Sequence, residues 1–272
     1  MSDVYFERTE DRAGFVDKYV RIADFAGIVK GKSVLVKPNI VSFEPYPTTT
    51  HPETLQAVLK HLKGNACKTV VADGPACDCK TDLKLHLLGQ ICDSLNVDFV
   101  NLSTIAMKNV WTKSGFDLEV SSLVFDFDFI ISLPVLKSHY VCGLTGALKN
   151  QYGILSSREK RDLHFAGTKD LHKAIAELSR IRKPDFYIVD AVETLIGAQE
   201  IRHGGKIEKL GYVFAGTDPV SLDSFGFELL KNVERRLHRV FRKCVPQQIK
   251  HIKYAIDFGV GEPEFVLHNL GT

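Results

Sequence analysis

The chain has 272 residues, of which 44% are hydrophobic and 25% are charged, and its formal net charge is +2. This length suffices for one large α/β domain or two small ones, and the composition is typical of a folded domain. The small net charge argues against a nucleic-acid partner, which usually requires a strong basic bias. One dense basic run is interpreted as the solvated face of a helix: Arg235, Arg236, Arg239, Arg242 and Lys243.

Targeting signals are not evident. No apolar run reaches the roughly 18 residues that a membrane span needs, and the first 14 residues carry charges of both signs without an apolar core. We therefore expect a cytoplasmic protein without a membrane partner. The six cysteines include no Cys-x-x-Cys pair, and disulfides are not expected in such a chain.

The hydrophobic pattern alternates between short apolar runs and amphipathic segments. The predicted helices cover residues 17–29, 52–62, 83–95, 170–182, 219–232 and 246–258. The predicted strands cover residues 33–37, 68–73, 97–102, 124–133, 186–192, 212–215 and 264–267. The segments 39–52, 73–82, 103–122 and 193–211 are expected to be irregular. This order predicts an α/β fold with a mostly parallel sheet covered by helices on both faces. We expect one domain over residues 1–272, with two lobes (about 1–135 and 136–272) as an alternative.

Polar motifs follow the predicted strands. Lys37 and Asn39 end the first strand, Asp73 ends the second, and Asp190 ends a later one. Because ligands in open α/β sheets bind beyond the carboxyl ends of the strands, these loops should converge on one cleft. The alternative for Lys37 is an aliphatic side chain that reaches from a buried strand to solvent.

The segment from Leu133 to Gly153, LPVLKSHYVCGLTGALKNQYG, contains the densest set of candidate residues. Lys137 and Lys149 offer cations for an anion, and His139 offers an imidazole that titrates near neutral pH. A desolvated lysine is also a potential nucleophile. Thr145 and Asn150 add polar groups beside glycines that permit close approach to a ligand. The spacing is not that of a phosphate loop, although amides at a helix start can hold an anion.

Three further positions have both a structural and a functional interpretation. His51 either caps a helix or contacts a ligand. Cys77 and Cys79, one residue apart after a strand, are either metal ligands or reactive thiols, although their spacing matches no standard zinc or cluster motif. Asp218 is interpreted as a helix cap and Asp223 as a structural residue.

These motifs together resemble a family known as "domain of unknown function three-six-two". The resemblance covers about residues 30–230 and rests on LVKPN (35–39), TTHPE (49–53), LPVLKSH (133–139), GLTGALKNQYG (143–153), KPDFYIVDAVE (183–193) and GTDPVSLDSFG (216–226). Many members append a two-cluster ferredoxin segment. This chain lacks those cysteine runs, so iron–sulfur binding is not carried over.

A more distant pattern is similar to the central segment of the nickel-pincer lactate racemase family. That resemblance implies that His139 is a proton-transfer residue, that Lys149 attaches the cofactor, and that His164 ligates a metal. The loop DGPACDC has no counterpart of the second catalytic histidine of those racemases.

Three functional hypotheses follow. The first is an enzyme that binds a small anionic, carboxylate-type substrate or cofactor in a Lys- and His-lined cleft, with acid–base chemistry that a metal could assist. The second is a redox or metal-handling accessory protein that uses Cys77, Cys79 and His164. The third is a non-catalytic anion-binding module. The substrate and the oligomeric state are not predicted.

Overall fold

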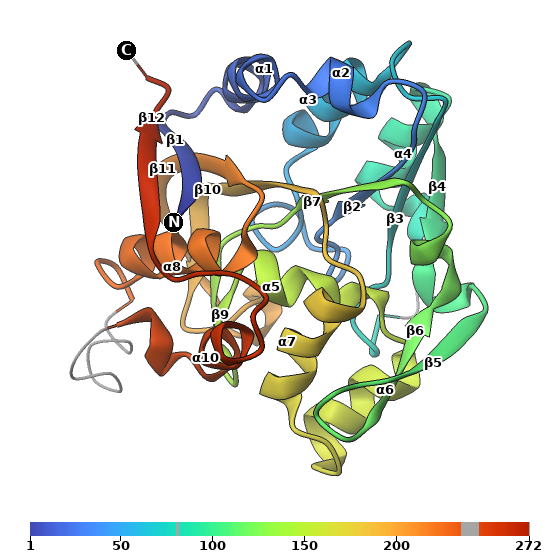
Figure 1. The fold of residues 1–272 in the computed structure, drawn as a ribbon, viewed down its shortest axis with the longest axis vertical. Coiled ribbons are helices and arrows are strands. Elements are labelled where there is room, and N and C mark those ends of the chain that lie inside the picture. Colours follow the sequence, from blue (N-terminus) through green and yellow to red (C-terminus); the bar gives the residue numbers. More distant parts are fainter. Residues whose placement is uncertain (80–81, 235–244, 272) are drawn as a thin grey trace.

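An eight-stranded sheet forms the centre of the computed structural model, which describes residues 1–79, 82–234 and 245–271 (Figure 1). The strand order is β12-β1-β11-β10-β7-β2-β3-β4. Its strands are β1 (Ser2–Arg8), β2 (Ser33–Pro38), β3 (Lys68–Asp73), β4 (Asp98–Asn101), β7 (Phe129–Leu133), β10 (Phe186–Ile196), β11 (Lys206–Gly216) and β12 (Phe265–Asn269). Five of its seven neighbouring pairs are parallel, and only the two pairs that involve β11 are antiparallel. The predicted α/β class with a mostly parallel sheet is confirmed.

Helices cover both faces of this sheet, because successive side chains of its buried strands point to opposite sides. On one face, Val34 and Val36 pack in a core with α1 (Arg12–Ile22), α2 (Phe25–Val29), α3 (Pro52–Leu62) and α4 (Leu87–Ser94). On the other face, Leu35 packs in a core with α5 (Ala147–Asn150), α7 (Leu171–Ile181), α8 (Pro219–Leu230) and α10 (Lys250–Asp257). Figure 1 shows these two helical layers above and below the sheet.

Several elements differ from the expected pattern. The helix expected over 17–29 is two helices, separated at Asp24, which adopts a left-handed conformation (φ 47°). The segment 103–122 contains the hairpin β5 (Met107–Trp111) and β6 (Asp117–Ser121), with Gly115 at its turn (φ 86°). The segment 193–211 is largely the continuation of β10 and β11 as a long hairpin. Strand β1 was not predicted, because its side chains are mostly half-buried and show no clear alternation.

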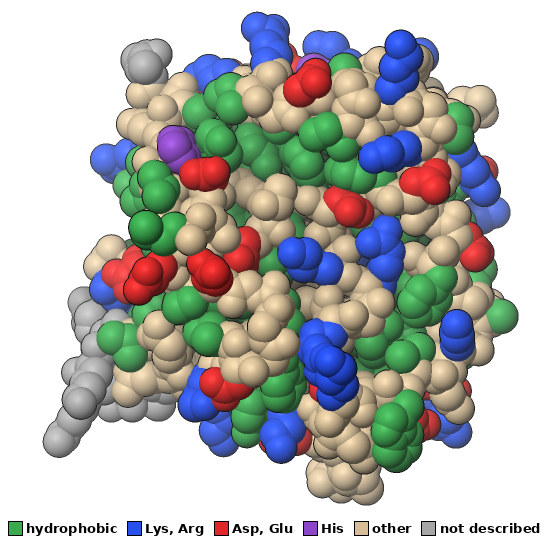
Figure 2. Space-filling model, viewed as in Figure 1, with side chains coloured by type: hydrophobic (Ala, Val, Ile, Leu, Met, Phe, Trp, Pro, Cys, Tyr) green, Lys and Arg blue, Asp and Glu red, His purple; other side chains and the backbone are tan. Residues whose placement is uncertain are grey.

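The interpretation of the basic run 235–243 lies outside the described residues. On the face shown in Figure 2, lysine and arginine side chains are interspersed with aspartate and glutamate side chains. None of the helices within 1–79, 82–234 and 245–271 is both long enough and apolar enough to cross a membrane.

A buried ion pair joins α1 to the middle of β10. Arg12 Nε donates to Asp190 Oδ2 at 2.6 Å, and the Tyr46 hydroxyl donates to Asp190 Oδ1 at 2.7 Å. The amide of Val192 also donates to Asp190 Oδ1. Both oxygens of the buried carboxylate are thereby satisfied, so Asp190 connects α1, the loop around Tyr46 and β10.

Replacement of Arg12 by methionine should destabilise the fold strongly, because it leaves Asp190 buried without its cation. We expect a loss of about 3–5 kcal/mol in the free energy of unfolding, measured by urea denaturation. Lys18→Met provides the control, since the pair between Lys18 and Glu7 is solvent-exposed and should contribute less than about 1 kcal/mol. Equal effects of the two substitutions would contradict this account.

Candidate functional site

A cavity of about 290 Å³ lies at the carboxyl ends of the parallel strands, where the loops after β2, β3, β7 and β10 meet. Most of the candidate residues from the sequence line it: Asn39, Asp73, Cys77, Lys137, His139, Thr145, Lys149, Asn150 and His164. Residues separated by more than 100 positions in the sequence therefore share one site, as ligand-binding loops of α/β sheets do.

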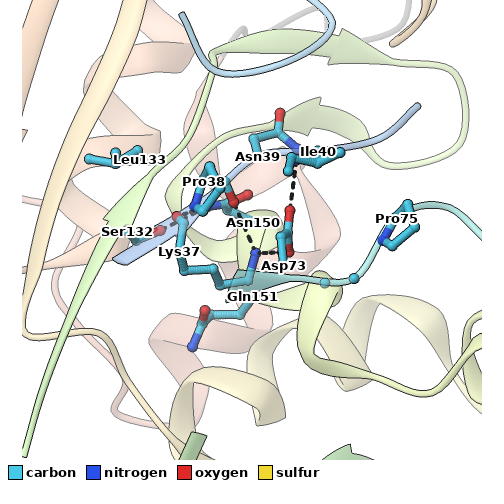
Figure 3. Close-up of polar contacts among 12 residues, drawn as sticks. Lys37, Pro38, Asn39, Ile40, Asp73, Pro75, Ser132, Leu133, Asn150 and Gln151 are labelled. Carbon is cyan, nitrogen blue, oxygen red and sulfur yellow. Dashed lines mark hydrogen bonds and ion pairs between the residues drawn. The ribbon is translucent and has the colours of Figure 1, made fainter. Parts of the chain in front are cut away.

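Lys37 and Asp73 form a buried ion pair at the base of the cavity (Figure 3). Lys37 Nζ donates to Asp73 Oδ1 at 2.6 Å, and Asp73 Oδ2 accepts from the amide of Ile40 at 2.7 Å. Burial lowers the pKa of Lys37, and Asp73 opposes that shift. A side chain at Gly153 would overlap both charged groups, which explains the glycine there. Asp73 lines the cavity, whereas Lys37 is not among the lining residues.

Lys137 lies on a short hairpin formed by β8 (Lys137–His139) and β9 (Gly143–Thr145). Its ammonium group donates to Asn39 Oδ1 at 2.8 Å and to the carbonyl of Thr48 at 2.6 Å. Burial lowers the pKa of Lys137 to about 7, and the more distant carboxylates of Glu200 and Glu44 oppose this shift only in part. The side chain of Lys137 is therefore expected to change between its charged and neutral forms near pH 7.

Lys160 is a cavity residue that was not predicted. It lies on the short helix α6 (Ser157–Arg161) and donates to the carbonyls of Gly74, Pro75 and Gly153 at 2.9, 3.0 and 3.3 Å. Burial lowers its pKa to about 7. The local sequence SREKR is typical of an exposed helix, so the sequence contains no signal for this inward lysine.

Lys149 is the amine with the least restraint. Its Nζ lies 4.5 Å from the centre of the Tyr152 ring, and no hydrogen-bond acceptor contacts it in the described part of the chain. Burial lowers its pKa. Its three N–H groups are therefore available to a ligand.

Asp223 positions the helix that carries Lys149. Its carboxylate accepts from the amides of Ala147 and Leu148 at 2.5 and 3.1 Å, at the start of α5. A side chain at Gly146 would overlap this carboxylate. The amides at this helix start therefore bind a carboxylate of the protein itself, not the external anion that the sequence suggested. Burial raises the pKa of Asp223 to about 7, and the two amides limit that shift.

Asn150 follows Lys149 and faces the same cavity. Its amide nitrogen donates to Ser132 Oγ at 2.9 Å and to the carbonyl of Lys37 at 3.4 Å, as drawn in part in Figure 3. Its carbonyl oxygen is buried and has no hydrogen-bond partner among the described residues. Asn150 thus retains an unused hydrogen-bond acceptor beneath the surface of the cavity wall.

His139 presents a hydrogen-bond donor to the cavity. Its Nδ1 accepts from the amides of Val141 and Cys142, both at 3.1 Å. An atom that accepts two N–H groups carries no proton, so the proton of the neutral ring resides on Nε2. Burial, together with the nearby charge of Lys149, holds the pKa of His139 well below its ordinary value. His139 is therefore neutral near pH 7.

His164 has the opposite tautomer. It lies on a single π-helical turn (Asp162–Ala166), a geometry often found at functional sites. Its Nδ1 lies 3.0 Å from the carbonyl of Lys160 and 2.8 Å from the Tyr152 hydroxyl, which itself donates to that carbonyl. Because the carbonyl only accepts, Nδ1 carries the proton and Nε2 has a free lone pair. Burial lowers the pKa of His164 to about 4. The ring centres of His164 and His139 are 6.3 Å apart.

Three other candidates lie elsewhere. His51 caps α3, accepting from the amide of Glu53, and Asp190 belongs to the ion pair with Arg12. Neither lines the cavity, and Cys79 does not line it either. His164, Cys77 and Cys79 are not brought together: within 1–79, 82–234 and 245–271, no group of three or more His, Cys, Asp or Glu side chains could hold a metal ion.

The loop between β10 and β11 supplies another wall that the sequence did not indicate. Gln199, Glu200 and His203 line the cavity there. Glu200 pairs with Arg202 at 2.7 Å, and Arg202 also reaches Asp78 on the opposite loop at 2.8 Å. The irregular appearance of residues 193–211 concealed this contribution.

Comparison with known proteins supports the assignment of the chain to a family. The model of the family "Domain of unknown function (DUF362)" matches residues 34–228. A thylakoid-associated protein of Synechocystis sp. is 26% identical over 204 residues, which are 71% of this chain and 61% of that protein. The chain thus spans about three fifths of the length of this relative.

Two solved structures share the fold. The lactate racemase apoprotein of Thermoanaerobacterium thermosaccharolyticum has a TM-score of 0.53 at 17% identity, with 80% of this chain and 54% of that chain covered. A crystal structure of a Thermotoga maritima protein has a TM-score of 0.50 at 15% identity, with 85% and 60% covered. At these identities the likeness concerns the fold alone. The chain therefore belongs to the family that shares the domain of unknown function DUF362, and its α/β fold is similar to that of the lactate racemase apoprotein.

Proposed function

We propose that this protein is an enzyme that binds a small carboxylate anion in the cavity and transfers a proton to and from it. The observation that carries the proposal is that two amides face the Nδ1 of His139 and a carbonyl faces the Nδ1 of His164, beside the Lys149 amine, so we assign opposite tautomers to the two histidines. In this scheme Lys149 binds the carboxylate, His139 donates a hydrogen bond through Nε2–H, and His164 accepts a proton on Nε2.

The proton balance follows from these assignments. A hydrogen removed from the carbon beside the carboxylate forms a bond to His164 Nε2, which becomes a cationic imidazolium. The electron pair of the broken bond stays on the substrate, where the charge is stabilised by Lys149 and by the N–H of His139. Return of the proton regenerates the neutral histidine. Burial of the site strengthens each of these interactions, because the local dielectric is low.

Isotope exchange tests this scheme. In D₂O the protein should exchange the α-hydrogen of a bound carboxylic acid, such as lactate or alanine, for deuterium. Proton NMR measures this exchange as the loss of the α-hydrogen signal. His164→Asn should reduce exchange by at least about a hundredfold with little loss of binding, because it removes the base and keeps a donor for the Lys160 carbonyl. Lys149→Met should weaken binding by at least about tenfold, whereas Lys60→Met, at an exposed helix position, serves as the control. If the wild-type protein binds the carboxylate without exchanging its α-hydrogen, and His139→Ala binds it equally well, a non-catalytic anion-binding module would be favoured.

The affinity for the anion should fall as the pH rises. Lys137 and Lys160 have pKa values lowered to about 7, and the pKa of Lys149 is also lowered. Below pH 7 Lys137 and Lys160 are charged and attract the anion, and above pH 7 they lose their protons. Loss of one cation about 4 Å away removes about 4 kcal/mol of attraction at an effective dielectric of about 20, so at least a tenfold weakening between pH 6 and 9 is expected. Titration calorimetry in two buffers should show proton uptake on binding. A flat pH profile would contradict the proposed role of the amines.

A second candidate concerns a cofactor attached through Lys149, as the racemase resemblance implies. The residues fit such a group: no described residue accepts a hydrogen bond from the Lys149 amine, and the Nδ1 of His164 is held by a carbonyl, as is usual for metal-ligating histidines. A metal ion held there would act as a Lewis acid on the bound anion. If this candidate is correct, intact-mass analysis of protein from its native source should show an adduct that is absent from Lys149→Arg. An unmodified mass for both proteins would exclude covalent attachment.

A further inference from the structure

The unused hydrogen-bond donors of the cavity lie at two places. A lysine ammonium has three N–H groups. Lys160 directs its donors to three carbonyls, so it has none left. Lys137 donates to two acceptors and retains one donor, and Lys149 has no acceptor in the described part of the chain. Lys137 and Lys149 are therefore the amines that a ligand can contact directly.

Thr145 completes the place beside Lys137. The two residues are directly paired across the β8–β9 hairpin, so their Cβ atoms are about 5 Å apart. Thr145 is a lining residue of the cavity, and its buried hydroxyl has no hydrogen-bond partner among the described residues. A polar atom removed from water without a partner is unfavourable, and an anionic group bound there would satisfy it together with Lys137.

The charges around the cavity do not balance. Lys37 and Asp73 neutralise each other, and Arg202 pairs with both Glu200 and Asp78. The nearby Glu44 carboxylate is bonded to the Thr48 hydroxyl and to the amides of Ile201 and Arg202. Among residues 1–79, 82–234 and 245–271, no carboxylate is bonded to the three remaining amines: Lys137, Lys149 and Lys160. The five cations outnumber the four carboxylates by one, so the charge balance alone accounts for one negative group on the ligand. The place for a second acidic group is given by the free donor of Lys137 beside Thr145.

We propose that the ligand carries two acidic groups, one bound by Lys149 and His139 and the other by Lys137 and Thr145. This inference rests on the proposed function and adds a substrate class to it. The cavity volume of about 290 Å³ equals roughly ten water volumes at about 30 Å³ each, so the two groups are joined by a short linker. Carboxylates and phosphates share the chemistry that amines and hydroxyls recognise, and either can be the second group.

A matched pair of ligands tests the inference. Succinate and succinamate have nearly the same size, but the second has one charge fewer. Calorimetry at pH 6.5 and constant ionic strength should show at least tenfold tighter binding of succinate. A third probe, 3-phosphonopropionate, identifies the second group: tighter binding than succinate indicates a phosphate, and weaker binding indicates a carboxylate. Equal affinities for succinate and succinamate would overturn the two-group inference and leave the proposed function intact. If the protein binds neither succinate nor succinamate, and also binds no monocarboxylate, the result would contradict both the two-group inference and the proposed function.

Thr145→Val separates a specific subsite from a general effect of positive charge. The hydroxyl has no hydrogen-bond partner in the part of the chain that the structure describes, so this substitution should not disturb folding. It should reduce the preference for succinate at least threefold and leave succinamate binding unchanged. Thr54→Val is the matched control, because the Thr54 hydroxyl is also buried and unpartnered but lies on α3, outside the cavity lining. An equal preference for succinate in wild type and Thr145→Val would remove Thr145 from the subsite and overturn the proposed arrangement.

Discussion

The ion pair between Lys37 and Asp73 is the interaction on which the arrangement of the site depends. It connects the ends of two adjacent central strands, and Asp73 also fixes the amide of Ile40, where the chain leaves β2. The pair occupies the space that a side chain at Gly153 would need, so the chain after α5 packs against it closely. The strand ends and the segment 143–153 are thereby held in one position, and the carbonyl of Gly153 is placed within reach of Lys160.

Two other lysines of the cavity differ from Lys37, because their partners are uncharged oxygen atoms. Lys137 and Lys160 are held by carbonyl oxygens, which orient an ammonium group but do not neutralise it. Their lowered pKa values show that the folded chain bears a free-energy cost for keeping these amines charged. Such a cost is common where a site is complementary to a ligand, because the ligand supplies the missing charge. The fold is stabilised instead by two apolar cores and by fully paired groups such as Arg12 with Asp190.

The sequence contained strong information about the centre of the sheet and weak information about its periphery. Strands such as SVLVK and KTVVAD are covered by helices on both faces of the sheet, so their central residues are all apolar. This continuous apolar pattern is typical of buried parallel strands. β1 and the β5–β6 hairpin lie partly at the surface, where polar and apolar positions mix and the period is lost. The helix expected over 17–29 divides at Asp24, an exposed residue whose left-handed conformation the hydrophobic pattern does not record.

The sequence likewise identified some residues of the site and missed others. The residues placed after strand ends, such as Asn39, Asp73 and His139, could be identified, because topology alone brings strand ends together. Lys160 could not be identified, since its inward direction depends on carbonyls that are 85 and 86 residues away in sequence. The partner of the α5 amides was also hidden. A carboxylate 76 residues downstream occupies a position that sequence spacing alone assigns equally well to a ligand.

The assignment of proton donor and acceptor emerges only from backbone geometry. A histidine in a sequence is equally able to accept or donate, and its surroundings decide which nitrogen carries the proton. Two amides of the β8–β9 turn direct their N–H groups at His139, whereas the π-helical turn places His164 against the Lys160 carbonyl of the preceding helix α6. The two rings face one cavity with opposite polarity, so one side can withdraw a proton while the other stabilises the resulting charge. That asymmetry arises from two short irregular segments, which the parallel sheet only holds in place.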